Sequence, residues 1–438
     1  MGHFSAAPIP TDSSHAANVY TGGMAQAYRW LLTRDFSLMW WSQVLSQVAE
    51  GISKLALLWF VYAVTGSPLK TTVIGLLQTL PPILFGPFIG VIVDRFPKKT
   101  ILIGSDVARG VLIGLIPCLV SVENFTVGSL YLLTFLYGVA TAVFVPTLSS
   151  AVPFMVTRPQ FTAANALLQS TTSLGIIIGP AVSGLGIAFA GSQDVLCLNA
   201  MTYFASAACL LPIRLRVTET TKTDGEGWRP FIRHLREGVR YAFLTHRTVL
   251  ILIILASVYT FGSGAFTTLF PVFGRHLLRL GPVEVGYLWS WLGVGLLLSS
   301  VGLIRMSGWD LSQRLSVTTL SCALAGLALW GLTWTDDFLL AAVLVGCIGL
   351  GFGAWTPIAW GIIQEVAPRG MVGRVMAVYT ASATATSMLG MSAFGWVAES
   401  FGSVVSIIGI GGVMCVLAGG SVWFGKKIGV AKIEKADV

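Results

Sequence analysis

Twelve apolar segments of about 20 residues, separated by short polar stretches, restrict the folds open to this chain. About 20 apolar residues form a helix long enough to cross the hydrocarbon core of a bilayer. Hydrophobic residues make up 55% and charged residues 11% of the 438 positions, whereas soluble domains carry about 25% charged residues. The pattern therefore predicts an all-α membrane protein with twelve transmembrane helices. The predicted spans are 36–64, 70–93, 100–120, 128–151, 162–190, 195–213, 247–273, 284–304, 314–334, 338–363, 373–398 and 403–424.

The positions of lysine and arginine predict the side of the membrane on which each end lies. Of the 27 basic residues, only Lys70, Arg275 and Arg279 fall in loops on the side opposite the N-terminus. Because basic residues concentrate in cytoplasmic loops, both termini are predicted to be cytoplasmic. The net charge of +8 then reflects membrane topology, and we expect no nucleic-acid partner.

One long polar connection divides the twelve segments into six and six, and we expect it to carry an amphipathic helix at the membrane surface. The predicted units are a cytoplasmic tail at 1–33, a six-helix bundle at 34–213, a cytoplasmic loop at 214–246, a second six-helix bundle at 247–425 and a cytoplasmic tail at 426–438.

An internal repeat supports this division. Three residues recur with identical spacing at an offset of 211 residues. They are Gly138, Pro146 and Arg158 in the first half and Gly349, Pro357 and Arg369 in the second. Parallel repeats of this kind are typical of transporters that bind substrate between two bundles.

A polar stripe runs along the first apolar segment. Gln43, Gln47, Glu50 and Lys54 fall within a sector of about 60° on one helix face. Charged residues at membrane depth usually face protein or a water-filled cavity. Two interpretations stay open: Glu50 exchanges a proton as its distance from Lys54 changes, or the two residues form a permanent ion pair that orients the helix.

Other spans offer polar and aromatic side chains that could line a central cavity. They are Gln78, Asn165, Gln169, Trp355, Trp360 and Gln364. Helix packing or an interfacial position is the alternative for each of them. Rings and amides together suit an amphiphilic organic molecule better than a small ion or a sugar.

Several classes of protein are disfavoured by what the sequence lacks. The six cysteines lie singly in apolar runs, which predicts buried free thiols rather than disulfides or a metal site. The sequence contains no phosphate-binding loop with its Lys-Ser/Thr and no HExxH motif. We therefore expect no enzyme activity and no cofactor, with the proton as coupling ion.

Two motifs resemble signatures of the major facilitator superfamily. GVIVDRFPKK, from Gly90 to Lys99, is similar to the loop between its second and third spans, although Pro97 stands where glycine is common. LGIIIGPAVSG, from Leu174 to Gly184, resembles the Gly-Pro signature of its exporters; Gly179, Pro180 and Gly184 would allow close packing and a bend.

Further strings resemble the branch that contains enterobactin exporters and macrolide-efflux proteins. They are RDFSLMW (34–40), VYAVTGSP (61–68), SDVARG (105–110), TAANALLQS (162–170) and GRVMA (373–377). The resemblance extends from about residue 34 to 425 and implies the twelve-helix fold of two bundles.

The resemblance also implies a latch at the cytoplasmic side. Asp94 would engage the region from Gly370 to Arg374 and close that side in the outward-open state. Arg95, Lys98 and Lys99 would assist it, although positive-inside anchoring explains them equally well. Asp106 and Arg109 are three residues apart and are expected to pair on one helix face, in a structural role at the latch or in a substrate or proton role.

Together these features predict a secondary active transporter in a bacterial plasma membrane. We expect a monomer that exports an amphiphilic drug, macrolide-like compound or siderophore in exchange for protons, by alternating access. The alternatives are an importer of a small organic solute and a transport-inactive sensor with the same fold.

Overall fold

The computed structural model describes residues 33–120, 126–156, 161–214, 239–241, 243, 247–304, 311–367 and 371–436, and these residues form helices and no strand. The helices are α2 (Arg34–Thr65), α3 (Pro68–Arg95), α4 (Lys98–Val120), α5 (Val127–Ala151), η2 (Val152–Phe154), α6 (Phe161–Leu210), α8 (Arg247–His276), α9 (Pro282–Ile304), α10 (Leu311–Gly331), η5 (Leu332–Trp334), α11 (Phe338–Val366), α12 (Val372–Phe401) and α13 (Ser403–Ala436). Within this part of the chain, nine helices are long and apolar enough to cross a membrane.

Helix α6 contains the fifth and sixth predicted spans. It changes direction at Gly191, whose φ of 86° is a conformation that favours glycine. The start of α2 contacts both arms at one level, because Trp40 donates to the Leu167 carbonyl and Ser42 bonds to Ser206. The two arms therefore run antiparallel. The prediction of an all-α membrane fold is confirmed, and the described helices accommodate the twelve predicted spans.

One prediction differs from the structure and another lies outside it. The predicted tail at 426–438 is not contradicted: helix α13 continues through it to Ala436, in a stretch with several Lys and Ala, which are good helix formers. Cys118 and Cys197 are exposed rather than buried. The N-terminal tail and almost all of the loop at 214–246, with its expected amphipathic helix, lie outside the described residues.

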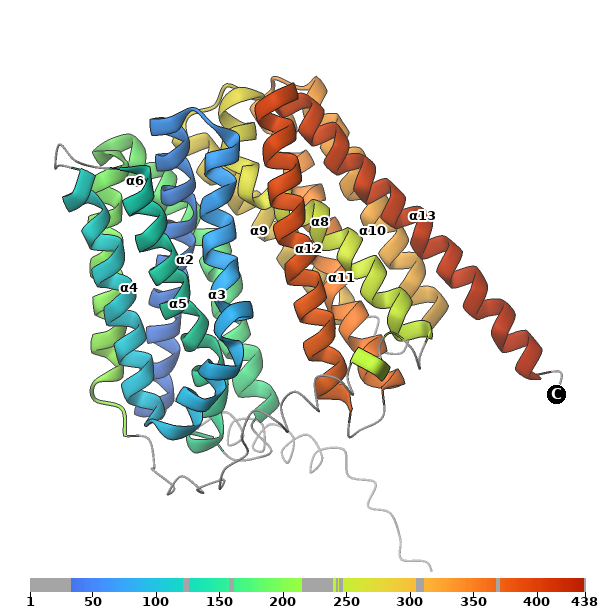
Figure 1. Ribbon diagram of the computed structural model, residues 1–438, viewed down its shortest axis with the longest axis horizontal. Coiled ribbons are helices and arrows are strands. Elements are labelled where there is room, and N and C mark those ends of the chain that lie inside the picture. The colour runs from blue at the N-terminus through green and yellow to red at the C-terminus, as the bar shows by residue number, and fades with distance from the viewer. Residues whose placement is uncertain are drawn as a thin grey trace, which may run out of the picture.

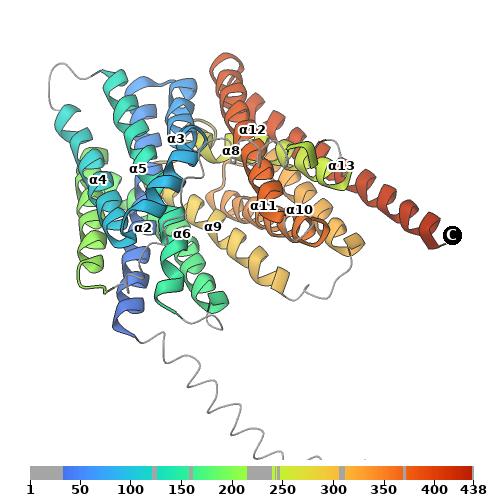
Figure 2. The same ribbon diagram turned by 60° about the horizontal axis from the view of Figure 1, so that its bottom comes forward.

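The helices form two groups. Helices α2–α6 pack against one another, and so do α8–α13; we call these the N-terminal and the C-terminal bundle. Figures 1 and 2 place the first bundle on one side of the molecule and the second on the other. Contacts between the bundles join α6 with α9, α3 with α12 and α8, and α2 with α8.

The internal repeat is visible in the backbone. Gly191 has φ 86° and ψ 162° between the last two spans of its half, and Gly402, at the offset of 211, has φ 90° and ψ 161°. Gly138 packs against the Leu77 carbonyl of α3, and Gly349 packs against the Leu292 carbonyl of α9. The two bundles are therefore built alike. Arg158 and Arg369 lie outside the described residues.

The bundles meet at one end of the molecule, where α2 ends and α3 begins; we call this end the closed face. Glu399 of α12 accepts hydrogen bonds from the Ser67 hydroxyl (2.7 Å) and the Leu69 N–H (3.2 Å) at the start of α3. The Arg275 guanidinium of α8 lies 5.6 Å from the ring centroid of Trp59 at the end of α2. Hydrogen bonds and a cation–π contact thus hold this face together.

The opposite end, where α3 ends at Arg95 and α12 begins at Val372, is called the open face. Figure 1 shows the lower ends of α3 and α12 apart, and the bundles spreading from the closed face toward this one. Contacts that join α3 to α12 include those of Ser67 with Glu399 and of Gly75 with Met391, in the half of α3 nearer the closed face.

Small residues allow the close approach of α6 and α9 at the closed face. A Cβ atom at Gly184 would overlap the Pro282 carbonyl oxygen and lie 3.2 Å from the Cα of Gly286. A Cβ at Gly286 would lie 2.5 Å from the Pro180 carbonyl oxygen. The structure thus places Gly184 and Pro180, from the Gly-Pro signature, at the interface between the bundles.

We expect Gly184→Ala to disfavour this conformation by about 1–3 kcal/mol, because the added methyl group overpacks the contact. The population of the two conformations can be measured from the distance between spin labels at Val64 and Phe401, which are 57% and 61% exposed at the closed face. Gly86→Ala is the control, since nothing lies within 4 Å of a Cβ at Gly86. An unchanged distance distribution in Gly184→Ala would refute the interpretation of this contact.

Candidate functional site

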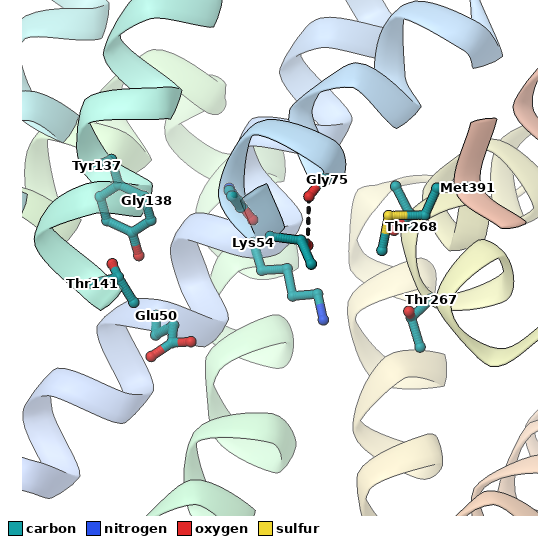
Figure 3. A pocket seen from close by; sticks show the side chains of 11 residues that line it. Glu50, Lys54, Gly75, Tyr137, Gly138, Thr141, Thr267, Thr268 and Met391 are labelled. Carbon is teal, nitrogen blue, oxygen red and sulfur yellow. Dashed lines mark hydrogen bonds between the residues drawn. The ribbon is translucent and has the colours of Figure 1, made fainter. Parts of the chain in front are cut away.

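A cavity of about 210 Å³ lies between the two bundles. Helices α2, α3 and α5 of the N-terminal bundle and α8 and α12 of the C-terminal bundle contribute its walls (Figure 3). The lining residues are Glu50, Lys54, Gly75, Gln78, Thr79, Tyr137, Gly138, Thr141, Thr267, Thr268 and Met391. The cavity therefore combines one acid, one amine, one amide and several hydroxyl groups with an apolar thioether.

Glu50 and Lys54 face the cavity from successive turns of α2 but do not form an ion pair. Figure 3 shows their head groups pointing in different directions. The Lys54 ammonium lies 5.6 Å from the ring centroid of Trp289 on α9, in the other bundle. The interpretation of a permanent Glu50–Lys54 pair therefore does not describe this conformation.

Two polar groups at the cavity have no hydrogen-bond partner in the structure. They are the Nε2 atom of Gln78 and the Oγ1 atom of Thr141. Buried polar groups are nearly always satisfied in folded proteins, by protein, water or ligand. Both line the cavity, and Thr141 lies near Glu50 (Figure 3), so the two groups are suited to hydrogen-bond a bound molecule.

The other half of the predicted stripe does not reach this cavity. Gln43 is 1% exposed within the N-terminal bundle. Gln47 packs against α6, where a Cβ at Gly175 would lie 2.9 Å from the Gln47 Cβ. The stripe is thus divided between the packing of α2 on α6 and the cavity wall.

The predicted aromatic and amide residues of α6 and α11 are placed as follows. Trp355 is buried in the C-terminal bundle, with its ring centroid 5.7 Å from that of Tyr259, and Trp360 is 42% exposed. Neither lines the cavity. The side chains of Asn165, Gln169 and Gln364 lie outside the described residues. Their roles in substrate binding stay predictions.

Asp106 and Arg109 form a buried ion pair on α4, which confirms their predicted pairing. Both are 0% exposed. Arg109 also donates to the Ser46 hydroxyl of α2 (3.0 Å), and Asp106 accepts from the Ser206 hydroxyl of α6 (2.7 Å). The pair thus joins three helices of the N-terminal bundle.

Aromatic rings complete the surroundings of Arg109 and lead to the cavity. Its guanidinium lies 4.2 Å from the ring centroid of Phe144 and 4.8 Å from that of Tyr203. The Tyr203 hydroxyl is 2.7 Å from the hydroxyl of Tyr137, which lines the cavity. The buried pair therefore lies behind the cavity wall that carries Glu50. Its contacts are with residues of α2, α5 and α6 inside the N-terminal bundle, rather than with residues at the open face.

The basic residues of the signature loop cap helix ends. The ammonium of Lys98 donates to the Val93 carbonyl near the end of α3, and that of Lys99 donates to the Leu211 carbonyl (2.5 Å) just after α6. Cations are favourable at these carbonyl ends. Arg95 and Gly90 are exposed, and the side chain of Asp94 lies outside the described residues.

The predicted latch stays a prediction. Its two sides, the end of α3 and the start of α12 with Arg374, lie apart at the open face (Figure 1). The latch is expected to form in the outward-open conformation, in which the cytoplasmic side is closed. The separation of its two sides in this structure is what a transport cycle requires of the other conformation.

The Gly-Pro signature packs α6 against two neighbours. A Cβ at Gly179 would lie 2.7 Å from the Cα of Gly51 on α2, and the Pro180 carbonyl contacts Gly286 of α9. The Ser290 hydroxyl of α9 donates to the Ile177 carbonyl (2.5 Å). One stretch of α6 thus couples the helix that carries Glu50 to the opposite bundle.

Several cavity residues were not predicted from the sequence. Thr267 and Thr268 are adjacent polar residues in a predicted span, and Tyr137 precedes the repeated Gly138. These signals could have identified them. Met391 and the contact of Lys54 with Trp289 carry no such signal, because they depend on how the bundles sit against each other.

Comparison with known proteins agrees with this architecture. A sequence model described as Major Facilitator Superfamily matches residues 39–391. Macrolide efflux protein A of Streptococcus pyogenes is 23% identical over 78% of this chain and 84% of its own length. Multidrug efflux pump Tap of Mycolicibacterium fortuitum is 26% identical over 81% of this chain and 86% of its own.

Solved structures resemble this chain in fold. A mutant of the nucleoside transporter NupG superposes with a TM-score of 0.71 at 11% identity, covering 90% of this chain and 98% of that one. A bacterial homologue of the iron transporter ferroportin, in an inward-facing state, has a TM-score of 0.70 at 14% identity, with coverage of 90% and 98%. At such identities the likeness concerns the fold alone.

Proposed function

Because the chain belongs to the Major Facilitator Superfamily, we propose that it exports an amphiphilic small molecule in exchange for protons, by alternating access between its two bundles. The observation that carries this proposal is the cavity between the bundles. It contains the carboxylate of Glu50, which forms no ion pair with Lys54 on the next turn of α2. A carboxylate at such a place can accept a proton or a cationic group, and it releases either when its surroundings change.

The mixed lining of the cavity supports an amphiphilic substrate. At about 210 Å³ the cavity is smaller than the sites of about 300–1,000 Å³ that enclose a drug-sized ligand. A large amphiphile would place its polar group beside Glu50 and Gln78 and extend toward the open face. The relatives named macrolide efflux protein and multidrug efflux pump add support for export of such molecules.

The direction of access follows from the predicted topology. The chain is a multi-pass protein of the plasma membrane, and the positive-inside rule places the open face on the cytoplasmic side. The conformation described here would then load substrate from the cytoplasm and would be closed to the outside by Glu399 and Arg275.

Expression in a bacterial strain that lacks its own major efflux pumps tests the proposal. Cells that produce the protein are expected to accumulate less of at least one amphiphile than cells with an empty vector, in a panel of erythromycin, ethidium and a catecholate siderophore. A protonophore should abolish the difference. Higher accumulation would indicate an importer, and no change for any compound with the protein present in the membrane would favour a transport-inactive protein.

A further inference from the structure

Lys54 is a contact between the two bundles. It belongs to α2, whereas the Trp289 ring beneath its ammonium belongs to α9. Trp289 is 3% exposed, and its ring centroid lies 5.2 Å from that of Phe270 on α8, so it is fixed within the C-terminal bundle. A cation within about 6 Å of a tryptophan face is attracted by the ring. The contact therefore stabilises the conformation in which the two helices approach.

Lys54 has a second partner within reach on its own helix. Glu50 precedes it by four residues, a spacing at which an acid and an amine on a helix can pair. Among the residues that the structure describes, Arg109, Tyr137 and Tyr203 also interact electrostatically with Glu50. All three belong to the same bundle as Glu50, so their positions relative to it are kept when the bundles move. Lys54 is the group whose surroundings change.

Opening of the closed face must separate Trp289 from α2. On α9, Trp289 stands between Gly286 and Ser290, which contact the Pro180 and Ile177 carbonyls of α6. Alternating access moves one bundle against the other around the central site. The movement that breaks these two contacts with α6 also withdraws the Trp289 ring from Lys54.

We infer that Trp289 is a positioning residue that holds Lys54 away from Glu50 while the closed face is shut. When that face opens, Lys54 turns to Glu50, and its ammonium displaces the cationic group of the substrate bound there. Lys54 keeps its own proton, the Glu50 carboxylate exchanges one cationic partner for the other, and the displaced substrate passes to water on the newly opened side. This inference rests on the proposed function, in which Glu50 binds the exchanged cation.

The distance between spin labels at Val64 and Phe401, in a variant without the six native cysteines and without substrate, tests this exchange of partners. Trp289→Leu is expected to raise the population with the closed face open by about 2- to 30-fold, since it removes a cation–π contact made only in the shut conformation. Glu50→Gln is expected to lower that population, because it removes the partner of Lys54 in the other conformation.

The same distance measurements in a protein that also carries Lys54→Met are the decisive control. If both residues act through Lys54, neither Trp289→Leu nor Glu50→Gln changes the distance distribution in that background. Trp289→Phe keeps an aromatic face and should have a smaller effect in the same direction as Trp289→Leu. Trp330→Leu, on α10, removes a tryptophan that bonds to the Ile408 carbonyl within the same bundle, and should leave the distribution unchanged.

Two results would overturn the inference. One is an unchanged distribution in Trp289→Leu; the other is a shift of equal size with and without Lys54. If Trp289→Leu does not fold, Trp289→Phe with and without Lys54→Met decides the question. The distance measurement uses neither substrate nor a proton gradient. Absence of transport in cells would therefore reject the proposed function, whereas the distance measurement tests the exchange of partners by Lys54 independently.

Discussion

In proteoliposomes, Glu50→Gln is expected to reduce pH-driven substrate accumulation to the level of protein-free vesicles. The amide cannot release a proton, so exchange at the cavity loses its driving reaction. Folding should be preserved, because Glu50 faces a cavity and makes no ion pair with Lys54. We expect its free energy of unfolding to stay within about 0.5 kcal/mol of the wild-type value.

Glu365→Gln is the matched control for this experiment. Glu365 makes the same chemical change on α11, where it is 58% exposed and pairs with Arg314. Accumulation by this variant should resemble that of the wild type. Full activity with unchanged pH dependence in Glu50→Gln would remove Glu50 from the mechanism.

Loss of the buried cation on α4 is expected to have the largest effect on stability. Arg109→Met leaves Asp106 buried at 0% exposure without its ion-pair partner. Breaking a buried pair in this way costs about 3–5 kcal/mol. Thermal unfolding in detergent, followed by the fraction of protein that stays monodisperse, should show a marked drop in the midpoint.

The double variant Asp106→Asn/Arg109→Met distinguishes an unpaired charge from lost packing. It removes both charges, so it should recover much of the stability lost in the single variant. Arg95→Met, at an exposed position, should change the free energy of unfolding by no more than about 0.5 kcal/mol. A single variant as stable as the wild type would show that the pair contributes nothing to folding.

The spans could be predicted from the sequence because membrane thickness fixes the length of an apolar helix. The predicted start at residue 247 and end at residue 151 agree with α8 and α5. The continuation of α13 to Ala436 could not be predicted, since a Lys-rich stretch is as typical of a polar tail as of an exposed helix. Hydropathy separates membrane from water but does not separate helix from coil.

The site could be predicted only in part. Glu50, Lys54 and Gln78 line the cavity, as expected for polar side chains at membrane depth, although their roles stay predictions. Gln43 shares the same helix face but is covered by its own bundle. Helical periodicity gives the direction of a side chain, and it does not give the neighbour that covers it. The partner of Lys54 required the placement of α9 relative to α2.

The structure extends the internal repeat to two pairs of positions that the sequence pattern had not shown. Gly75 lies against Met391, and Gly286 lies against Pro180, so both contacting positions are related by the offset of 211 residues. Glycine occupies the first position in both halves, whereas the second position is Met391 in one contact and Pro180 in the other. A contact of this kind needs one small residue and tolerates variation in its partner. Each half thus supplies one close contact to the closed face, as two similar bundles rocking about a central site require.

Proton movement driven by substrate tests the central claim most directly. Vesicles with an acidic lumen and a trapped pH indicator are given external erythromycin, or whichever compound the cellular panel identifies. The account predicts that wild-type protein alkalinises the lumen in a saturable manner, beyond the passive effect of a weak base seen in vesicles with Glu50→Gln. Substrate accumulation with no proton movement beyond that control would contradict it.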